Sequence, residues 1–346
     1  GGVELAPLHM ANRRGPYVFA DLARDTWKGL PPLLADALPD DFGNALVDAW
    51  MARQGVDPSR ITALDRLAYT GERGLGALTF HPPAGDRVEE PTAIALAELV
   101  TSARQVLTGE FPDEAPAEEA LRQLIQVGSS AGGARAKAVI AFNPETYQIR
   151  SGQFDAPPGF RHWLIKLDGV SAGSDRGVRI GDGKEYGRVE YAYHLMATAA
   201  GIDMTECRLL PEGPRAHFMT RRFDRTDDGS RLHLVSLCGL AHLDFRRPGV
   251  NSYEQLLLTV DQLDLGAAAR AEVFRRLVLN VAAVNRDDHT KNTAFLCSPD
   301  GRWSLAPAFD VTHSYRVDSV WVARHQMSVN GRTEGIGRAD LDEVGD

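Results

Sequence analysis

The sequence predicts an α+β fold in which a sheet-rich part with one inserted helix is followed by a helical part. Between residues 137 and 223, short apolar runs of strand character are separated by Gly, Pro, Asn or Asp. After about residue 252, the apolar residues instead recur at the period of an α-helix. The expected strands are 137–142, 146–150, 163–167, 207–210 and 216–223, and the expected helices are 189–200, 253–260 and 267–284.

A small mixed α/β region precedes these two parts. Residues 17–19 and 75–80 have strand character, and residues 44–53 have the pattern of a short amphipathic helix. A linker leads into a helix over 86–108, and a further helix is expected at 118–127. The predicted domains are an N-terminal subdomain (1–110), a sheet-rich part (111–225) and a helical part (226–346).

The composition excludes several classes of protein. The 346 residues include 43% hydrophobic and 25% charged residues, as in an ordinary folded protein. The net charge of −9 argues against general binding to a nucleic-acid backbone. No apolar run reaches the ~20 residues of a membrane-spanning helix, so we expect a cytoplasmic protein without membrane contact. Cys207, Cys238 and Cys297 are widely spaced, which fits a reducing compartment better than disulfides or zinc.

Lysine is rare in this chain, because only five of the 38 basic residues are lysines. Each lysine therefore suggests a role beyond general surface charge, such as a compact positive charge beside a phosphate. Three of them, Lys137, Lys166 and Lys291, lie in the segments that carry the candidate chemistry.

The Gly-rich segment 128–137 ends in one of these lysines and runs into a predicted strand. Its small residues would let backbone N–H groups approach phosphate oxygens, and Lys137 would add positive charge. The pattern is neither G-x-G-x-x-G nor a Walker A sequence, so a flexible turn is the alternative interpretation.

Lys166 lies inside the apolar strand 163–167. Because side chains alternate along a strand, this lysine either faces solvent or reaches a buried anion. Glu190, on the following predicted helix, is its natural ion-pair partner.

The segment 285–292 places two acids, a histidine, a lysine and an asparagine between apolar neighbours. Asp287 and Asn292 have the spacing of the D-x-x-x-x-N catalytic loop of protein kinases. In that loop the aspartate accepts or orients the substrate hydroxyl proton, and the asparagine binds Mg²⁺. Asp288 is a rival for the role of base, and a capped turn is the structural alternative. Asp310, which follows a predicted strand, could hold Mg²⁺ against the nucleotide phosphates.

The chain order of these segments is that of a protein kinase, from Gly-rich loop to metal-binding aspartate. The sequence resembles the HipA-type toxin kinases of bacterial toxin–antitoxin modules, in the motifs at 130–137, 222–225, 287–292 and 309–310. The resemblance implies a two-lobed, protein-kinase-like fold with a small mixed α/β N-terminal subdomain and a helical C-terminal lobe. It also implies a Ser/Thr protein kinase that uses ATP and Mg²⁺.

The resemblance further implies two protein partners. One is a helix-turn-helix, HipB-like antitoxin, through which any contact with DNA would be made. The other is a protein substrate of the translation machinery, such as an aminoacyl-tRNA synthetase.

The family's functional residues carry over by motif. Asp287 would be the catalytic base, Asn292 and Asp310 the Mg²⁺ ligands, and Ser130 the serine whose autophosphorylation silences family members. Lys166 would contact the α- and β-phosphates. The other residues expected to contact ATP are Gly132, Gly133, Ala134, Arg135, Ala136 and Lys137 at the phosphates, Arg221, Arg222 and Phe223 beside the adenine, and His289 and Lys291 near the nucleotide.

Two other functions remain open at the level of sequence. A small-molecule kinase of the aminoglycoside-phosphotransferase type would share the acidic loop and the metal-binding aspartate. A catalytically silent module that only binds its antitoxin would keep the fold without the activity.

Overall fold

The computed structural model describes residues 22–84, 96–108, 124, 135–152, 155–171 and 185–345 of the chain. These residues divide into two compact units, which are described separately. The sheet unit comprises the described residues of 37–191 and 205–231, and the helical unit those of 1–36, 192–204 and 232–346. The three predicted domain boundaries stay a prediction.

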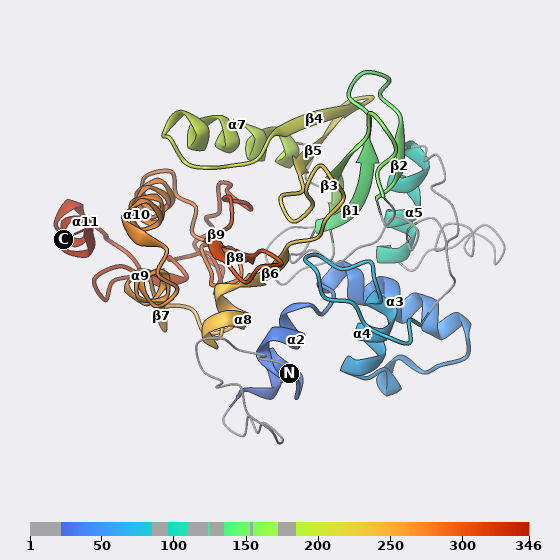
Figure 1. Cartoon of the computed structure of the whole chain (residues 1–346), viewed down its shortest axis with the longest axis horizontal. Helices are drawn as coiled ribbons and strands as arrows, with labels where there is room; N and C mark the ends of the chain where they lie inside the picture. Colours follow the sequence, from blue (N-terminus) through green and yellow to red (C-terminus); the bar gives the residue numbers. More distant parts are fainter. Residues whose placement is uncertain are drawn as a thin grey trace. The chain divides into compact units, whose positions relative to one another are not determined.

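The sheet unit contains a five-stranded antiparallel sheet with the strand order β2-β1-β3-β5-β4 (Figure 1). The five strands predicted between residues 137 and 223 are found, although β3 is longer than expected at both ends and the strand predicted at 146–150 is present only as Ile149–Ser151. The strands are β1 (Arg135–Phe142), β2 (Ile149–Ser151), β3 (Arg161–Ser171), β4 (Cys207–Glu212) and β5 (Arg215–Arg221).

Several helices accompany this sheet. They are α3 (Asp41–Arg53), α4 (Ala63–Thr70), α5 (Leu96–Thr108) and α7 (Tyr186–Ala199), with the short 3₁₀ helix η1 (Pro58–Arg60). The helices predicted at 44–53 and 189–200 are thereby confirmed, as is the helix expected to end the stretch 86–108, whose residues 86–95 lie outside the described residues. The strand predicted at 17–19 lies outside the described residues, as does the helix predicted at 118–127 except for Leu124.

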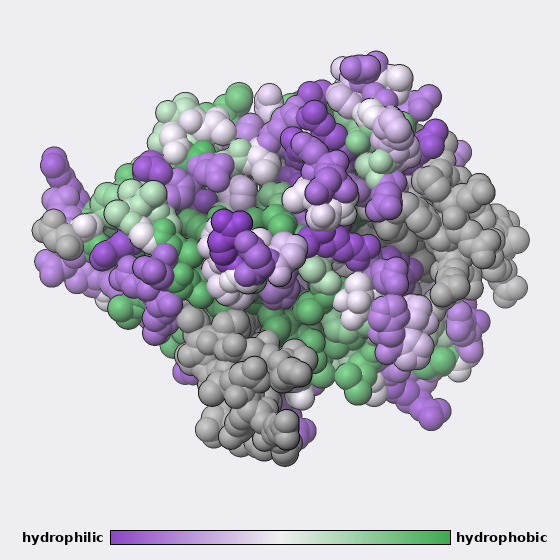
Figure 2. Space-filling model, viewed as in Figure 1, coloured by the Kyte–Doolittle hydropathy of each residue, from purple (hydrophilic) through white to green (hydrophobic). Residues whose placement is uncertain are grey.

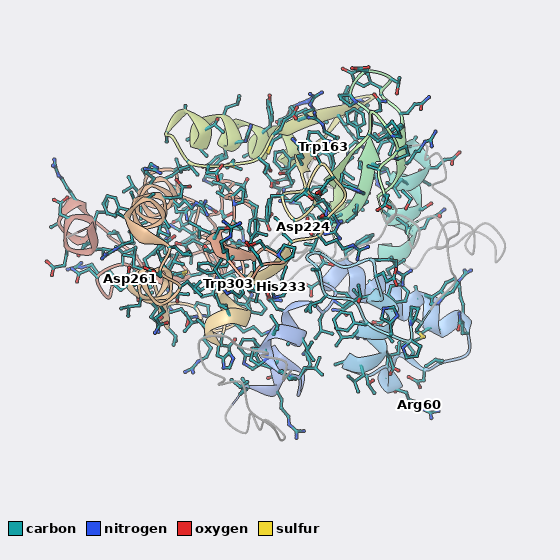
Figure 3. All side chains as sticks on the ribbon, viewed as in Figure 1. Arg60, Trp163, Asp224, His233, Asp261 and Trp303 are labelled. Atoms are coloured by element: carbon teal, nitrogen blue, oxygen red, sulfur yellow. The ribbon has the colours of Figure 1, made fainter. Side chains whose placement is uncertain are left out.

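The two faces of the sheet differ in chemistry, because side chains alternate along each strand. Ile140 of β1 and the fully buried Trp163 and Ile165 of β3 belong to the hydrophobic core that the sheet shares with α3 and α5 (Figure 3). Lys137 and Lys166 interrupt these apolar residues in β1 and β3, at directly opposed positions. Alternation therefore places both lysines on the face away from that core.

The strand predicted at 75–80 is wrong, because these residues form a loop. The backbone of this loop binds side chains rather than a neighbouring strand. Gly76 donates its N–H to Asp224 Oδ2 at 2.6 Å, and Arg225 Nη1 donates to the carbonyl of Gly76 at 3.0 Å. The same Arg225 Nη1 lies 2.8 Å from Asp224 Oδ2.

Asp224 is the buried centre of this loop anchor (Figure 3). Arg222 Nη2 also lies 2.6 Å from its Oδ2. Burial alone would raise the pKa of the Asp224 carboxyl, but the charges and hydrogen bonds of Arg222, Arg225 and the Gly76 N–H lower it to about 2. The cluster thus holds an ionised carboxylate in the interior.

The helical unit begins with α1 (Arg24–Trp27) and α2 (Pro32–Asp36), which pack with later residues. Thr26 Oγ1 donates to Asp244 Oδ1 at 2.6 Å, and Asp36 accepts the N–H and the hydroxyl of Ser236, each at 2.7 Å. The unit also contains a three-stranded antiparallel sheet of order β6-β8-β9 and a parallel pair, β7 and β10. These strands are β6 (His233–Ser236), β7 (Asn251–Ser252), β8 (Ala294–Cys297), β9 (Trp303–Leu305) and β10 (Met327–Ser328).

Helices α9 (Tyr253–Gln262) and α10 (Gly266–Ala282) confirm the two helices predicted in this part of the chain, and α8 (Leu237–Ala241) and α11 (Arg338–Gly345) complete the unit. A capping box starts α9, because the side chains of Ser252 and Gln255 each accept the other's backbone N–H. Leu256, Val260, Val273 and Leu277 of the two helices are buried. This packing holds the end of α10 and the loop that follows it.

Within the described residues, no helix combines the length and the apolar character needed to cross a membrane. On the face drawn in Figure 2, hydrophilic residues cover much of the surface and hydrophobic ones lie between them.

The first turn of α7 packs directly on β5, and a glycine makes this possible. A Cβ at Gly187 would overlap the carbonyl oxygen of Ala216 and lie 3.1 Å from the amide nitrogen of Phe218. This close approach places Glu190, one turn further along α7, beside Lys166 of β3.

We predict that Gly187→Ala destabilises the protein by about 1–3 kcal/mol, because the added methyl group forces α7 away from the backbone of β5. Urea denaturation would measure the loss. Arg188→Ala, at an exposed position in the same turn, is the matched control and should change stability by less than about 0.5 kcal/mol. Equal stabilities of Gly187→Ala and the wild type would contradict the close packing of α7 on β5.

We also predict a pH-dependent contribution from Asp224. Its folded pKa of about 2 lies below the usual value of about 3.9, so its stabilisation is present above about pH 4 and is lost as the pH falls towards 2. This contribution is on the order of 2 kcal/mol. The stability difference between the wild type and Asp224→Asn, measured by urea denaturation, should therefore shrink from pH 4 to pH 2. A difference that stays constant over this range would count against the buried ionised carboxylate.

Candidate active site

The candidate catalytic loop, residues 285–292, connects α10 to β8 in the helical unit. Helix α10 ends at Ala282, and Val284 then adopts a left-handed conformation with φ of 57°. This conformation is strained for a β-branched residue. Hydrogen bonds to one later residue hold the turn, because Ser314 donates to the carbonyl of Val284 and accepts from the N–H of Arg286, both at 3.1 Å.

The two aspartates of this loop have different surroundings. The side chain of Asp287 is 28% exposed, and its Oδ1 lies 3.8 Å from His289 Nε2. The side chain of Asp288 is only 2% exposed, and both of its oxygens accept hydrogen bonds. Asp287 is therefore the aspartate of this pair that an external group can reach.

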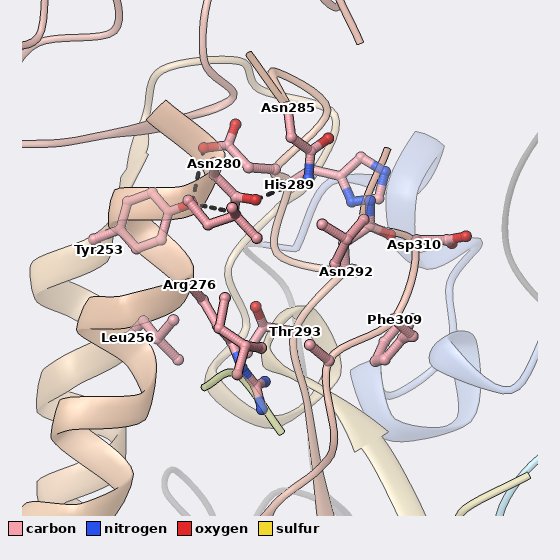
Figure 4. A pocket seen from close by; sticks show the side chains of 15 residues that line it. Tyr253, Leu256, Arg276, Asn280, Asn285, His289, Asn292, Thr293, Phe309 and Asp310 are labelled. Carbon is pink, nitrogen blue, oxygen red and sulfur yellow. Dashed lines mark hydrogen bonds between the residues drawn. The ribbon is translucent and has the colours of Figure 1, made fainter. Parts of the chain in front are cut away.

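Asn292 and Asp310 line one small cavity of about 30 Å³ in the helical unit, together with Asn285, Asp288 and His289 (Figure 4). The side-chain nitrogen of Asn292 donates to the carbonyl of Asp287 at 2.7 Å. Because the nitrogen is used in this bond, the side-chain oxygen is the atom left to face a cation. The structure thus brings together the two predicted metal ligands, although they lie far apart in the sequence.

The donor set of these two residues fits Mg²⁺, because both supply oxygen atoms. Two protein oxygens suit this cation, which keeps several waters and binds phosphates in the remaining positions. Among the described residues, no group of three or more His, Cys, Asp or Glu side chains is placed to hold a metal ion on its own.

Lys166 in the sheet unit pairs with Glu190 of α7, as the sequence predicted. Both side chains are buried, at 9% and 2% exposure, so the pair compensates two charges that would be costly alone. Arg135 Nη1 lies 3.5 Å from the second oxygen of Glu190, and Arg135 also stacks over the ring of Tyr186. The buried Lys137 lies directly across the sheet from Lys166, so three predicted phosphate-binding cations lie close together.

The residues predicted to lie beside the adenine are the last residue of β5 and the two that follow it, and two of them have ion-pair partners within the sheet unit. Arg222 is buried and holds Asp224 and the carbonyl of Gly74. Arg221 forms an ion pair with Asp227, and Phe223 is half-buried. Arg222 therefore anchors the loop that contains Gly74, which sequence reasoning did not foresee.

Lys291 and Ala136 also have local partners. Lys291 Nζ lies 3.8 Å from Asp36 Oδ1 and 5.0 Å from the ring centroid of Phe245, both in the helical unit. Ala136 is fully buried in the core of the sheet unit. The remaining predicted site residues, Ser130, Gly132, Gly133 and Ala134, lie outside the described residues.

Sequence reasoning missed three side chains of the network around Asp288 and Asn285 in the candidate catalytic loop. Tyr253, Asn280 and His325 come from α9, α10 and the segment before β10, and they connect to Asp288 or Asn285. Asn280 gave the only signal, as an amide within the otherwise apolar run 277–284. Tyr253 and His325 gave none, because their separation from Asp288 in the sequence hides the contact.

Comparison with known proteins agrees with this architecture. A family model described as the HipA-like C-terminal domain matches residues 129–344, and one described as the HipA N-terminal domain matches residues 1–81. The comparison with curated proteins finds no match.

Among solved structures, the chain resembles one in the complex of HipA, HipB and operator DNA of the Shewanella oneidensis MR-1 toxin–antitoxin system. The TM-score is 0.62 at 17% identity, over 91% of this chain and 72% of that chain. The proinflammatory kinase CtkA of Helicobacter pylori gives a TM-score of 0.33 at 14% identity, over 44% of this chain and 50% of that chain, which is too low to support an argument. The first similarity shows the fold and confirms the predicted HipA-like α+β architecture.

The C-terminal family model alone spans more than half of the chain, and the N-terminal model matches the region ahead of it. The chain therefore belongs to the HipA family.

Proposed function

We propose that this protein is a protein kinase that transfers the γ-phosphoryl group of ATP to a serine or threonine hydroxyl, and that it acts as the toxin of a toxin–antitoxin pair. One observation carries the kinase proposal. Asn292 and Asp310 line the same cavity, while Asp287, whose carbonyl binds Asn292, has a solvent-accessible carboxylate. A base and two oxygen ligands for Mg²⁺ in one place are the parts that phosphoryl transfer requires.

Asp287 is the proposed base. In the transfer, a bond forms between the acceptor oxygen and the γ-phosphorus, the bond to the β,γ-bridging oxygen breaks, and Asp287 accepts the hydroxyl proton. Asp288 is the less suitable base in this proposal, because its two oxygens are engaged in three hydrogen bonds. His289 lies 3.8 Å from Asp287 and lines the nucleotide side of the loop in this proposal.

ATP and Mg²⁺ are the proposed cofactors. Asn292 and Asp310 would hold the cation, which neutralises phosphate charge when bound. Lys166 would contact the α- and β-phosphates, and Glu190 would hold its ammonium in a fixed position. Arg135 and Lys137 add positive charge near Lys166, which suits a polyphosphate.

The toxin part of the proposal rests on the family and on the neighbouring structure, which was solved with HipB and operator DNA. A HipB-like helix-turn-helix antitoxin is the proposed partner, and it would supply the contact with DNA. This division fits the net charge of −9, which disfavours direct binding of this chain to a nucleic-acid backbone. A protein of the translation machinery, such as an aminoacyl-tRNA synthetase, is the proposed substrate.

We predict that Asp287→Asn and Asp288→Asn fail in different ways. Asp287→Asn should lower Mg-ATP-dependent phosphate transfer by about 100-fold or more, with a change in stability below about 0.5 kcal/mol. Asp288→Asn should instead lose about 1–3 kcal/mol of stability, because one oxygen that accepts hydrogen bonds becomes an N–H donor. Radiolabelled transfer and urea denaturation would measure the two effects. If Asp287→Asn transferred phosphate at the wild-type rate while Asp288→Asn was stable and inactive, the two roles would be reversed.

We also predict that phosphatase-treated protein gains the mass of one phosphate when incubated with Mg-ATP, and that the modified residue is Ser130. Intact mass spectrometry and peptide mapping would detect the change. Asp287→Asn should gain no phosphate, and Ser129→Ala, which alters the neighbouring serine, should still gain it. No gain in a wild-type protein that binds ATP would favour a small-molecule kinase or a binding-only relative.

A further inference from the structure

The carboxylate of Asp288 joins the candidate catalytic loop to two other segments of the helical unit. Its Oδ1 accepts the N–H of Gln326 at 2.8 Å, and its Oδ2 lies 2.9 Å from both the Tyr253 hydroxyl and His325 Nδ1. Because a carboxylate accepts hydrogen bonds, we assign His325 Nδ1 as the donor of its bond to Asp288. Asp288, Tyr253, His325 and Gln326 are all buried, which makes each unmet bond costly.

A chain of hydrogen bonds returns from Asp288 to the start of the same loop. Asn280 of α10 donates its side-chain N–H to the Tyr253 hydroxyl, and the Asn285 side chain donates to Asn280 Oδ1, each at 2.9 Å (Figure 4). Burial, and then the neighbouring Asp288, raise the pKa of Tyr253 well above its usual range, so this phenol keeps its proton. Asn285 and Asp288 are thus fixed to the same pair of helices.

Asp287 lies between these two fixed positions. Its backbone position follows from theirs, since only Arg286 separates it from Asn285 and it adjoins Asp288. The entry to the loop at Val284 is strained, so the loop needs contacts of this kind to stay in place.

We propose that the network Asn285–Asn280–Tyr253–Asp288–His325 positions the carboxylate of Asp287 for proton transfer. Its members are positioning residues, because they act through the loop and not on a substrate. The bond between His325 and Asp288 also fixes the position of the end of segment 311–326. This segment begins directly after Asp310, the proposed metal ligand. The proposal rests on the proposed function, because it assigns a role relative to the base of that reaction.

The test uses the full chain with His325→Ala and His325→Asn. His325→Ala removes a donor to Asp288, and we expect kcat for Mg-ATP-dependent transfer to fall about 100-fold while KM for ATP changes less than about threefold. His325→Asn places a side-chain N–H close to the position of Nδ1 and should restore most of kcat. If His325 had only a structural role, His325→Ala and His325→Asn proteins of equal thermal stability would have equal kcat.

Hydrogen exchange of the backbone amides in residues 285–292 provides a second readout that needs no activity. We expect faster exchange there in His325→Ala and wild-type exchange in His325→Asn. His233→Ala is the matched control. That histidine belongs to the same unit and contacts Trp303 with ring centroids 6.1 Å apart, and its replacement should leave both kcat and exchange of the loop unchanged.

The outcomes separate this proposal from the proposed function. A wild-type protein without phosphate transfer to itself or to any protein would overturn the function, and hydrogen exchange would still decide on the network. Wild-type exchange of residues 285–292 in His325→Ala, or an unchanged kcat in an active protein, would overturn the network. If His325→Ala does not fold, Tyr253→Phe removes only one hydroxyl and must give the same two effects.

Discussion

The burial of carboxyl groups is the constraint on which the internal structure of each unit depends. A carboxylate taken out of water must be met by donors, or folding becomes unfavourable. In the helical unit Asp288 finds them on Tyr253, His325 and Gln326. In the sheet unit the partners of Glu190 lie on β1 and β3, and Asp224 binds the N–H of Gly76 in a distant loop as well as its neighbour Arg222. Each acid therefore fixes the position of a segment that is distant from it in the sequence.

The same constraint separates two adjacent aspartates into two roles. Asp288 is buried, and its carboxyl group forms hydrogen bonds that hold the loop to other segments. Asp287, next to it, keeps an accessible side chain whose position the fold has already set. A reaction that depends on positioning and on the neutralisation of charge needs this combination of a rigid backbone and an exposed carboxylate. One short loop thus contains a residue that stabilises the fold, Asp288, and a different residue for the proposed chemistry, Asp287.

Regular elements could be predicted from the sequence because their signals are local. The short apolar runs at 137–142 and 163–167 and the helical period in 253–260 and 267–284 arise from the residues that these elements bury. The strand predicted at 75–80 failed because its apolar character is local, whereas its conformation depends on Asp224 and Arg225, far along the chain. The pairing of Lys166 with Glu190 could be predicted because only one strand and one turn of helix α7 had to be placed correctly.

For the candidate site, the candidates themselves could be predicted from the sequence. The spacing of Asp287 and Asn292, and the acid at Asp310, are read directly from the chain. The sequence could not separate Asp287 from Asp288, because the two differ only in what surrounds them. In the folded chain the two aspartates differ, because Tyr253 and His325 contact Asp288 whereas the side chain of Asp287 stays accessible. The physical reason is that hydrogen bonding and desolvation depend on neighbours in space, which a residue's own type and spacing do not encode.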